Sequence, residues 1–350
     1  MTTLPAISGT TVFLANIPDI QLGEAESMDV SVAAGEIVCF NETIYCEADG
    51  CCWLRDMLSL LRPHLPAGLT EVAITVDQDV YFVNVFYCLV YIENLYGSVE
   101  DWLDTHFLTT AQVKRTTMDS MERLAFYSTG NVILTYQALF LLADGTHSTV
   151  SGQFSVDRSL YTRGNITCYD FSPSVIDYES GIDGKLLGYF VYAENRSMKF
   201  LLDPTVDETQ VSRFVYLNAF GVEEDLSLVG TLASPRQVDY TSVFLKGLRR
   251  TLSPDLQIPY RLTTATLTRD EIVSLTEMLS SESVWFGDTD DDKNLVNYSG
   301  DLTFAPTSEP GKAASAEFSF SYAFRNRRWV DTSGLIVNNV FDDTFDKTFN

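Results

Sequence analysis

Apolar and polar residues alternate along most of this chain, in short runs separated by turn residues. The run "MDVSVAAGEIVCFNETIYC" alternates on both sides of Gly35, and "TEVAITVDQDVYFVNVFYCLVYI" on both sides of 77–79. Alternation with a period of two is typical of strands with one buried face. The run "SAEFSFSYAF" shows the same period and places four aromatic residues on one face: Phe318, Phe320, Tyr322 and Phe324. We therefore predict a mainly β protein.

Turn signals are dense, and no repeating helices separate the predicted strands. Asp144-Gly145 and Asp183-Gly184 are each flanked by apolar runs, which is the strongest short hairpin signal. This pattern favours packed antiparallel sheets over a doubly wound sheet. We expect two or three antiparallel β-sandwich domains, Ig-like or jelly-roll-like, with a few short capping helices and a C-terminal arm.

Three segments have helical periodicity and are predicted as capping helices. Residues 52–65 place Leu54, Met57, Leu58 and Leu61 on one face before Pro66. Residues 98–108 begin with Ser98 and acidic residues, which suit a helix N-terminus. Residues 268–282 open with the capping box Thr268-x-x-Glu271 and are expected to bury Ile272, Leu275 and Leu279.

The 350 residues are too many for one ordinary core, so we predict several domains. Asp203-Pro204-Thr205 follows a strand-like run and is interpreted as a linker. The expected division is an N-terminal β-rich domain, 1–105, and a second β region, 106–202, which together can form one unit. A C-terminal domain, 203–335, and an arm, 336–350, complete the chain.

The charge of the chain disfavours two classes of partner. A formal net charge of −25 and a pI near 4.3 repel phosphate backbones, so we expect no nucleic acid as a partner. Anionic membranes are disfavoured for the same reason. The most apolar stretch, 80–92, is shorter than the roughly 20 residues of a spanning helix. The first residues show no cationic segment followed by an apolar one, so we expect synthesis in a cytoplasm without a secretory signal.

Six cysteines are present, and four of them fall between residues 39 and 52: Cys39, Cys46, Cys51 and Cys52, followed by Cys88 and Cys168. Their spacings do not match paired C-x₂-C zinc ligands. Cysteine is also among the most buried residue types. Reduced thiols in the core or in turns are therefore favoured over a metal site or a disulfide.

Candidate chemistry is sparse. His64, His106 and His147 stand far apart, and none has a nucleophile motif beside it. Asp288, Asp290 and Asp292 begin a D-x-D-x-D calcium pattern, but Lys293 and Ser299 occupy the positions that need glycine and glutamate. A solvated acidic loop is favoured there, with calcium as the weaker alternative. We predict no cofactor and no catalytic residue.

The chain ends in "FDDTFDKTFN", where Phe341, Phe345 and Phe349 recur every fourth residue. Helix and strand both place such a stripe on one face, and ten residues cannot bury it alone. Two alternatives stay open beside disorder. The stripe docks on the last domain of its own chain, or it inserts as an arm into a neighbouring subunit and forms an assembly contact.

Several runs resemble structural proteins of Bacteroidetes tailed phages and prophages. They include "CFNETIYCEADGCCWLRDMLSLLRPHL", "VFYCLVYI", "THFLTTAQVKRT", "ERLAFYS" and "FVYLNAFGVEEDLSLVG". The last run matches a family segment NxFG…E…G through Asn218, Phe220, Gly221, Glu223 or Glu224, and Gly230. The resemblance spans most of 30–350 and implies a virion component of the tail, baseplate or tail tip. It implies no active-site residue.

The predicted function is a non-enzymatic virion structural protein that assembles with copies of itself and with neighbouring virion proteins. One alternative is a carbohydrate-binding or receptor-adhesion module, in which an exposed tryptophan stacks on a glycan: Trp53, Trp102, Trp285 or Trp329. A hydrolase is the other alternative, and it requires two convergent carboxylates or a histidine-centred triad.

Overall fold

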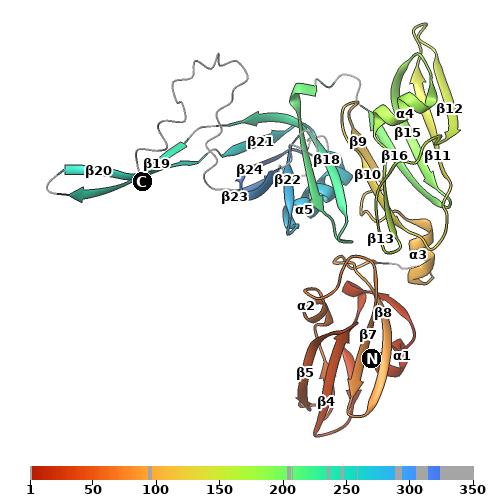
Figure 1. Ribbon diagram of the computed structural model, residues 1–350, viewed down its shortest axis with the longest axis vertical. Coiled ribbons are helices and arrows are strands. Elements are labelled where there is room, and N and C mark those ends of the chain that lie inside the picture. Colours follow the sequence, from red (N-terminus) through yellow and green to blue (C-terminus); the bar gives the residue numbers. More distant parts are fainter. Residues whose placement is uncertain are drawn as a thin grey trace, which may run out of the picture.

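The computed structural model describes residues 2–93, 97–202, 206, 208–234, 237–245, 248–257, 259–287, 294–304 and 314–323. Strands dominate these residues, as the sequence predicts, and the helices are short. Figure 1 shows an N-terminal unit, a second unit beyond it, a barrel beside the second unit and a long hairpin that leaves the barrel. No helix in the parts of the chain described here is long and apolar enough to cross a membrane.

The N-terminal unit is built on a five-stranded sheet of order β2-β8-β7-β4-β5. Its strands are β2 (Thr11–Phe13), β4 (Ser27–Ala34), β5 (Ile37–Tyr45), β7 (Leu69–Val76) and β8 (Asp79–Phe86). One face of the sheet buries alternate residues, among them Val32, Val72 and Ile74. The predicted turns at Gly35 and at 77–79 are confirmed as the β4–β5 and β7–β8 connections.

A smaller sheet of order β1-β3-β6 accompanies this core. It consists of β1 (Thr2–Thr3), β3 (Ile20–Gly23) and β6 (Cys52–Leu54), with α1 (Leu4–Ile7), the 3-10 helix η1 (Leu14–Asn16) and α2 (Met57–Leu61) nearby. The predicted helix 52–65 is wrong in its first five residues and ends earlier than predicted, at Leu61. Cys52 and Leu54 are buried while Trp53 is half-buried, so this stretch pairs with β3. The helix begins only after Asp56, whose side chain accepts from the Ser59 amide.

The second unit has two sheets that share one core. The larger has the order β12-β11-β15-β16-β9, and the smaller the order β10-β14-β13. The strands are β9 (Val113–Thr116), β10 (Arg123–Tyr127), β11 (Leu134–Leu141), β12 (His147–Gln153), β13 (Ser159–Arg163), β14 (Ile166–Asp170), β15 (Lys185–Ala193) and β16 (Arg196–Leu202). The helices are α3 (Val99–Thr105) and α4 (Pro173–Ser180).

One hairpin of this unit follows the sequence signal and the other does not. Asp144-Gly145 turns β11 into β12, as predicted. Asp183-Gly184 joins α4 to β15, so the predicted hairpin there is wrong. The turn between β15 and β16 falls instead at Glu194, which adopts a left-handed conformation (φ 55°). The left-handed conformation that a tight hairpin turn needs is therefore adopted here by a glutamate and not by the glycine of an Asp-Gly pair.

The C-terminal part forms a closed barrel of order β17-β18-β21-β24-β23-β22, where we expected a sandwich. Its strands are β17 (Val211–Leu217), β18 (Glu223–Ala233), β21 (Tyr260–Thr264), β22 (Val284–Phe286), β23 (Asn294–Phe304) and β24 (Ala316–Tyr322), with η2 (Glu208–Gln210) before them. The helix α5 (Arg269–Ser280) packs on the barrel core with Leu275 and Met278. Ile272 and Leu279, expected to be buried, are only half-buried.

The pairing is mostly antiparallel, but three parallel pairs depart from the prediction: β1 with β3, β2 with β8 and β9 with β16. Parallel neighbours require long connections, which alternation within single strands does not reveal. Three core clusters fill the N-terminal unit, the second unit and the barrel. A fourth joins them, with Phe13 and Phe86 from the first, Leu103 from α3 and Phe220 from the barrel side.

Candidate functional site

Both groups of predicted site residues lie outside the residues that the structure describes. Asp288, Asp290 and Asp292, the weak calcium candidates, fall in the gap 288–293. Phe341, Phe345 and Phe349, the predicted assembly contacts, follow residue 323. The interpretation of both groups stays a prediction. Among the described residues, no group of three or more His, Cys, Asp or Glu side chains could hold a metal ion.

The histidines and tryptophans lie on separate elements. His64 follows α2, His106 follows α3 and His147 begins β12. The His106 ring stacks on Trp102 with the centroids 4.6 Å apart. Trp53, Trp102 and Trp285 are each half-buried, and the guanidinium of Arg55 lies over the Trp53 ring. Trp329 lies outside the described residues.

The six cysteines are free thiols, four of them buried: Cys51, Cys52, Cys88 and Cys168. Cys39 is half-buried and Cys46 is exposed. Burial raises the pKa of both Cys88 and Cys168 to about 12, so these two thiols stay protonated and unreactive at neutral pH.

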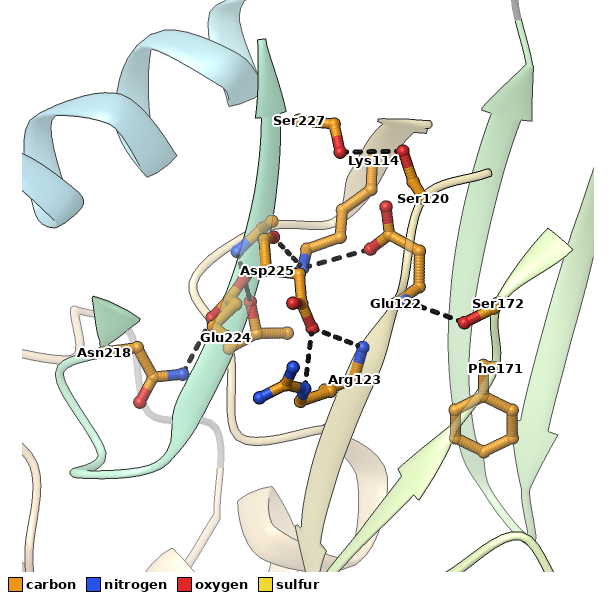
Figure 2. A network of polar contacts seen from close by, with 12 residues as sticks. Lys114, Ser120, Glu122, Arg123, Phe171, Ser172, Asn218, Glu224, Asp225 and Ser227 are labelled. Carbon is orange, nitrogen blue, oxygen red and sulfur yellow. Dashed lines mark hydrogen bonds and ion pairs between the residues drawn. The ribbon is translucent and has the colours of Figure 1, made fainter. Parts of the chain in front are cut away.

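The most concentrated polar chemistry is a buried ion network between the second unit and the barrel (Figure 2). Lys114 on β9 is its centre, and its Nζ lies 3.1 Å from Oε1 of Glu224 and 3.6 Å from Oε2 of Glu122. It also donates to the backbone carbonyl of Asp225 at 3.0 Å. Glu224 and Asp225 belong to β18, while Glu122 lies in the loop just before β10, so one ammonium links β9 and this loop to a strand of the barrel.

Arg123 supplies the second cation of this ion network. Its backbone N–H donates to Oδ2 of Asp225 at 3.0 Å, and its Nε lies 3.3 Å from the same oxygen. Its Nη1 also pairs with Glu223. Beside these charges the hydroxyls of Ser120 and Ser227 share a hydrogen bond of 2.8 Å. The contacts therefore connect β10 and the loop before it to successive residues of β18.

The Asn218–Gly221 turn positions the inner end of β18. Asn218 donates from Nδ2 to Oε2 of Glu224 at 2.7 Å and to the Leu108 carbonyl at 2.7 Å. Gly221 has a φ of +71°, which glycine adopts without strain, and a Cβ on it would lie 3.1 Å from Cε1 of Tyr87. Of the two glutamates that could match the NxFG…E…G segment, Glu224 is the buried one that contacts Asn218.

Burial and like charges shift two carboxyl groups here. Burial raises the pKa of Glu122 to about 7, although the nearby Lys114 ammonium opposes the shift. Burial and then the charge of Glu224 raise the pKa of Glu277, on α5, to about 7. Burial lowers the pKa of Lys114, but the charges of Glu224 and Glu122 outweigh it and the net pKa is raised. Lys114 therefore stays positively charged at neutral pH, whereas the pKa values of Glu122 and Glu277 lie near neutrality.

Lys114 and Glu122 at the centre of the network are enclosed, which limits what they can do chemically. Lys114 and Glu122 are 6% and 1% exposed, so a substrate has no access to them in this conformation. A buried ion network adds little net stability, but removing one partner leaves an unpaired buried charge, so the intact arrangement is strongly preferred over a broken one. We interpret it as a joint that sets the barrel against the second unit. Sequence reasoning missed it, although the adjacent acids Glu224-Asp225 inside an apolar strand run were a visible signal.

A second feature missed from the sequence is the long hairpin of β19 (Gln237–Leu245) and β20 (Leu248–Gln257). Ala233 of β18 pairs with Arg261 of β21. Gln237, four residues after Ala233, pairs with Gln257, four residues before Arg261. The hairpin therefore continues the register of the β18–β21 pair beyond the barrel, as Figure 1 shows. Lys246-Gly247 between two apolar runs was the available turn signal.

No protein-family model matches the chain, and no curated protein matches it. Among solved structures, a similar chain comes from one described as "Tail of empty GTA particle computed with helical refinement, C6 symmetry". The similarity covers 34% of this chain and 96% of that chain, at 10% sequence identity and a TM-score of 0.25. This TM-score is too low to support a shared fold.

Proposed function

We propose that this chain is a non-enzymatic structural protein of a tailed bacteriophage, a tail, baseplate or tail-tip component that assembles with copies of itself and with neighbouring virion proteins. Its location is the virion, after synthesis in the host cytoplasm. The assignment to a virion rests on the resemblance of the runs quoted above, including the Asn218–Gly230 segment. The proposal includes no catalytic step and no cofactor.

The projecting hairpin β19–β20 carries the assembly part of this proposal. Its two strands have nine and ten residues and, within the described chain, pair only with each other. A two-stranded hairpin is marginally stable by itself in water. Its sequence, "QVDYTSVFLKGLRRTLSPDLQ", is rich in residues that favour strands. A long extension of this kind is expected to gain its stability from another chain.

A shortened variant tests the assembly. Replacing 235–259 by an Asn-Gly turn joins Ser234 to Tyr260 in the register that β18 and β21 already have, so the barrel is preserved. We expect the full-length protein to form a defined oligomer and the shortened protein to be monomeric, measured by sedimentation velocity and light scattering. Circular dichroism of both proteins controls for folding. Equal masses for the two folded proteins would contradict the proposal.

A further inference from the structure

The strand β5 leaves one edge of the N-terminal sheet open. It is the last strand of the order β2-β8-β7-β4-β5 and, among the described strands, pairs only with β4. Its nine residues, "IVCFNETIY", include no lysine, arginine or proline. Ile37, Val38 and Tyr45 are 50%, 60% and 72% exposed. The register with β4 shifts at Cys39, which marks a bulge, so the uninterrupted part of this edge is Phe40–Tyr45. Proteins normally protect long edge strands with lysine, proline or a bulge, and this part of β5 has none of them, which indicates a docking site.

The hydrogen bonds next to this strand show which backbone groups face outward. The Cys46 amide donates to the Glu26 carbonyl at 3.0 Å, so this opposed pair is hydrogen-bonded. Hydrogen-bonded and non-bonded pairs alternate in an antiparallel ladder. Asn41, Thr43 and Tyr45 therefore direct their N–H and C=O groups away from β4. The Asp77 amide supports this assignment, because it donates to the carbonyl of Asp29, the residue opposite Thr43, and this carbonyl therefore faces β7 and not β5.

The hairpin β19–β20 offers one matching edge. Within β20, Pro254 stands opposite Tyr240 and has no N–H to donate, which weakens that strand as a pairing edge. The strand β19 has nine residues and no proline. Its outer edge is continuous, because the register shift of the hairpin falls in β20, and it is long enough to pair with Phe40–Tyr45 of β5.

The charges of the hairpin and of the N-terminal unit also favour pairing of β19 with β5. Residues 1–93 carry thirteen acidic residues against Arg55 and Arg62 alone. The hairpin carries Lys246, Arg249 and Arg250 against two aspartates, which makes it a positive segment in a chain of net charge −25. Opposite charge steers two such surfaces together and suppresses other pairings.

We propose that β19 of one copy adds to the β5 edge of a second copy. This inference rests on the proposed function and names the surface that receives the hairpin. The pairing is antiparallel, which brings the C-terminal end of β19, followed in the sequence by Lys246, near Glu36 at the start of β5. Glu36 is exposed and forms no ion pair with the described residues, whereas Glu47, at the other end of β5, already pairs with Arg55. Main-chain hydrogen bonds provide the affinity, as in other strand additions.

A proline substitution tests the backbone pairing. Asn41→Pro removes one outward N–H and leaves the bonds to β4 in place, while Asn41→Ala keeps that N–H and serves as the matched control. We expect Asn41→Pro to weaken self-association about tenfold or more, and Asn41→Ala to change it by less than about twofold. The dissociation constant is measured by sedimentation equilibrium. Equal dissociation constants for the two variants would overturn the proposal.

Zero-length cross-linking of the unmodified protein gives a readout that does not depend on a variant folding. A carbodiimide, applied to a mixture of ¹⁴N- and ¹⁵N-labelled protein, is expected to join Lys246 of one copy to Glu36 of another. Cross-links from Glu36 to Lys347 instead would assign the edge to the C-terminal segment and overturn the proposal. Cross-links from Lys246 to acids outside 1–93 would also overturn it.

The two proposals fail in different ways. If shortening the hairpin dissociates the oligomer but Asn41→Pro does not, the hairpin assembles the protein through another surface and only this inference falls. If neither change affects the mass, both proposals fall.

Discussion

Glu122 holds a carboxyl group inside the protein, where its charged form is costly. Its pKa is raised to about 7, and that of Glu277 likewise, so the folded protein binds protons that the unfolded chain releases above pH 4.5. A raised carboxyl pKa contributes stability that is complete below the unfolded pKa and is lost as the pH rises through the folded pKa. The free energy of unfolding should therefore fall between about pH 4.5 and about pH 7.

The variant Glu122→Gln isolates this effect from the repulsion of the overall negative charge. We expect its unfolding free energy to change less steeply with pH, by about 1 kcal/mol per pH unit near pH 6. Urea denaturation at a series of pH values measures the slope. Glu71→Gln, on the exposed surface of β7, serves as the control and should keep the slope of the original protein. A Glu122→Gln slope equal to that of the control would refute the role of the buried carboxyl.

Gly230 marks a place where two strands of the barrel approach closely. A Cβ there would lie 2.4 Å from the carbonyl oxygen of Thr263 and 2.8 Å from Cα of Thr264, both on the neighbouring β21 backbone. We expect Gly230→Ala to lower the unfolding free energy by about 1–3 kcal/mol, because backbone must shift to admit the methyl group. Gly130→Ala, where a Cβ meets nothing within 4 Å, should cost far less. Thermal denaturation compares the two, and similar losses would contradict this explanation.

Among the elements, α5 illustrates a boundary that the sequence alone predicts. Thr268 accepts from the Glu271 amide at 3.2 Å, and Glu271 accepts from the Thr268 amide in return. We expect Thr268→Ala to cost about 1 kcal/mol of stability, because the Glu271 amide loses its side-chain acceptor at the N-terminus of the helix. Thr276→Ala, at an exposed position in the same helix, should cost nothing or stabilise slightly. Chemical denaturation that ranks Thr276→Ala as the more damaging change would refute the cap.

Local signals were sufficient where a few neighbouring residues determine the conformation. The caps at Ser98 and Thr268, the turn at Gly35 and the hairpin at Asp144-Gly145 all follow from such signals. Helix 52–65 was mispredicted because Cys52 and Leu54 suit the buried side of a strand as well as a helix face. Tertiary pairing with β3 decides between the two, and a single window of sequence cannot show it.

At the scale of the whole molecule, the arrangement of the units depends on residues far apart in the chain. Lys114 and Glu224 are separated by more than a hundred positions, and Arg123 and Glu223 by 100. Alternation of apolar and polar residues identifies the strands that carry these residues, but it does not show that the strands lie close together. The sequence therefore predicted β content without predicting the ion network between the units or the closed barrel. The hairpin was missed for a related reason, since its register continues that of β18 and β21 beyond the barrel.

The central claim is that this chain works as a building unit whose hairpin is completed by another copy. A cryo-electron microscopy map of the full-length assembly tests it most directly. We predict strand density of a second chain beside β19, with β5 as its source, in every copy that is not at an end of the assembly. A map of separate protomers whose β19–β20 hairpins are surrounded only by solvent would contradict the account.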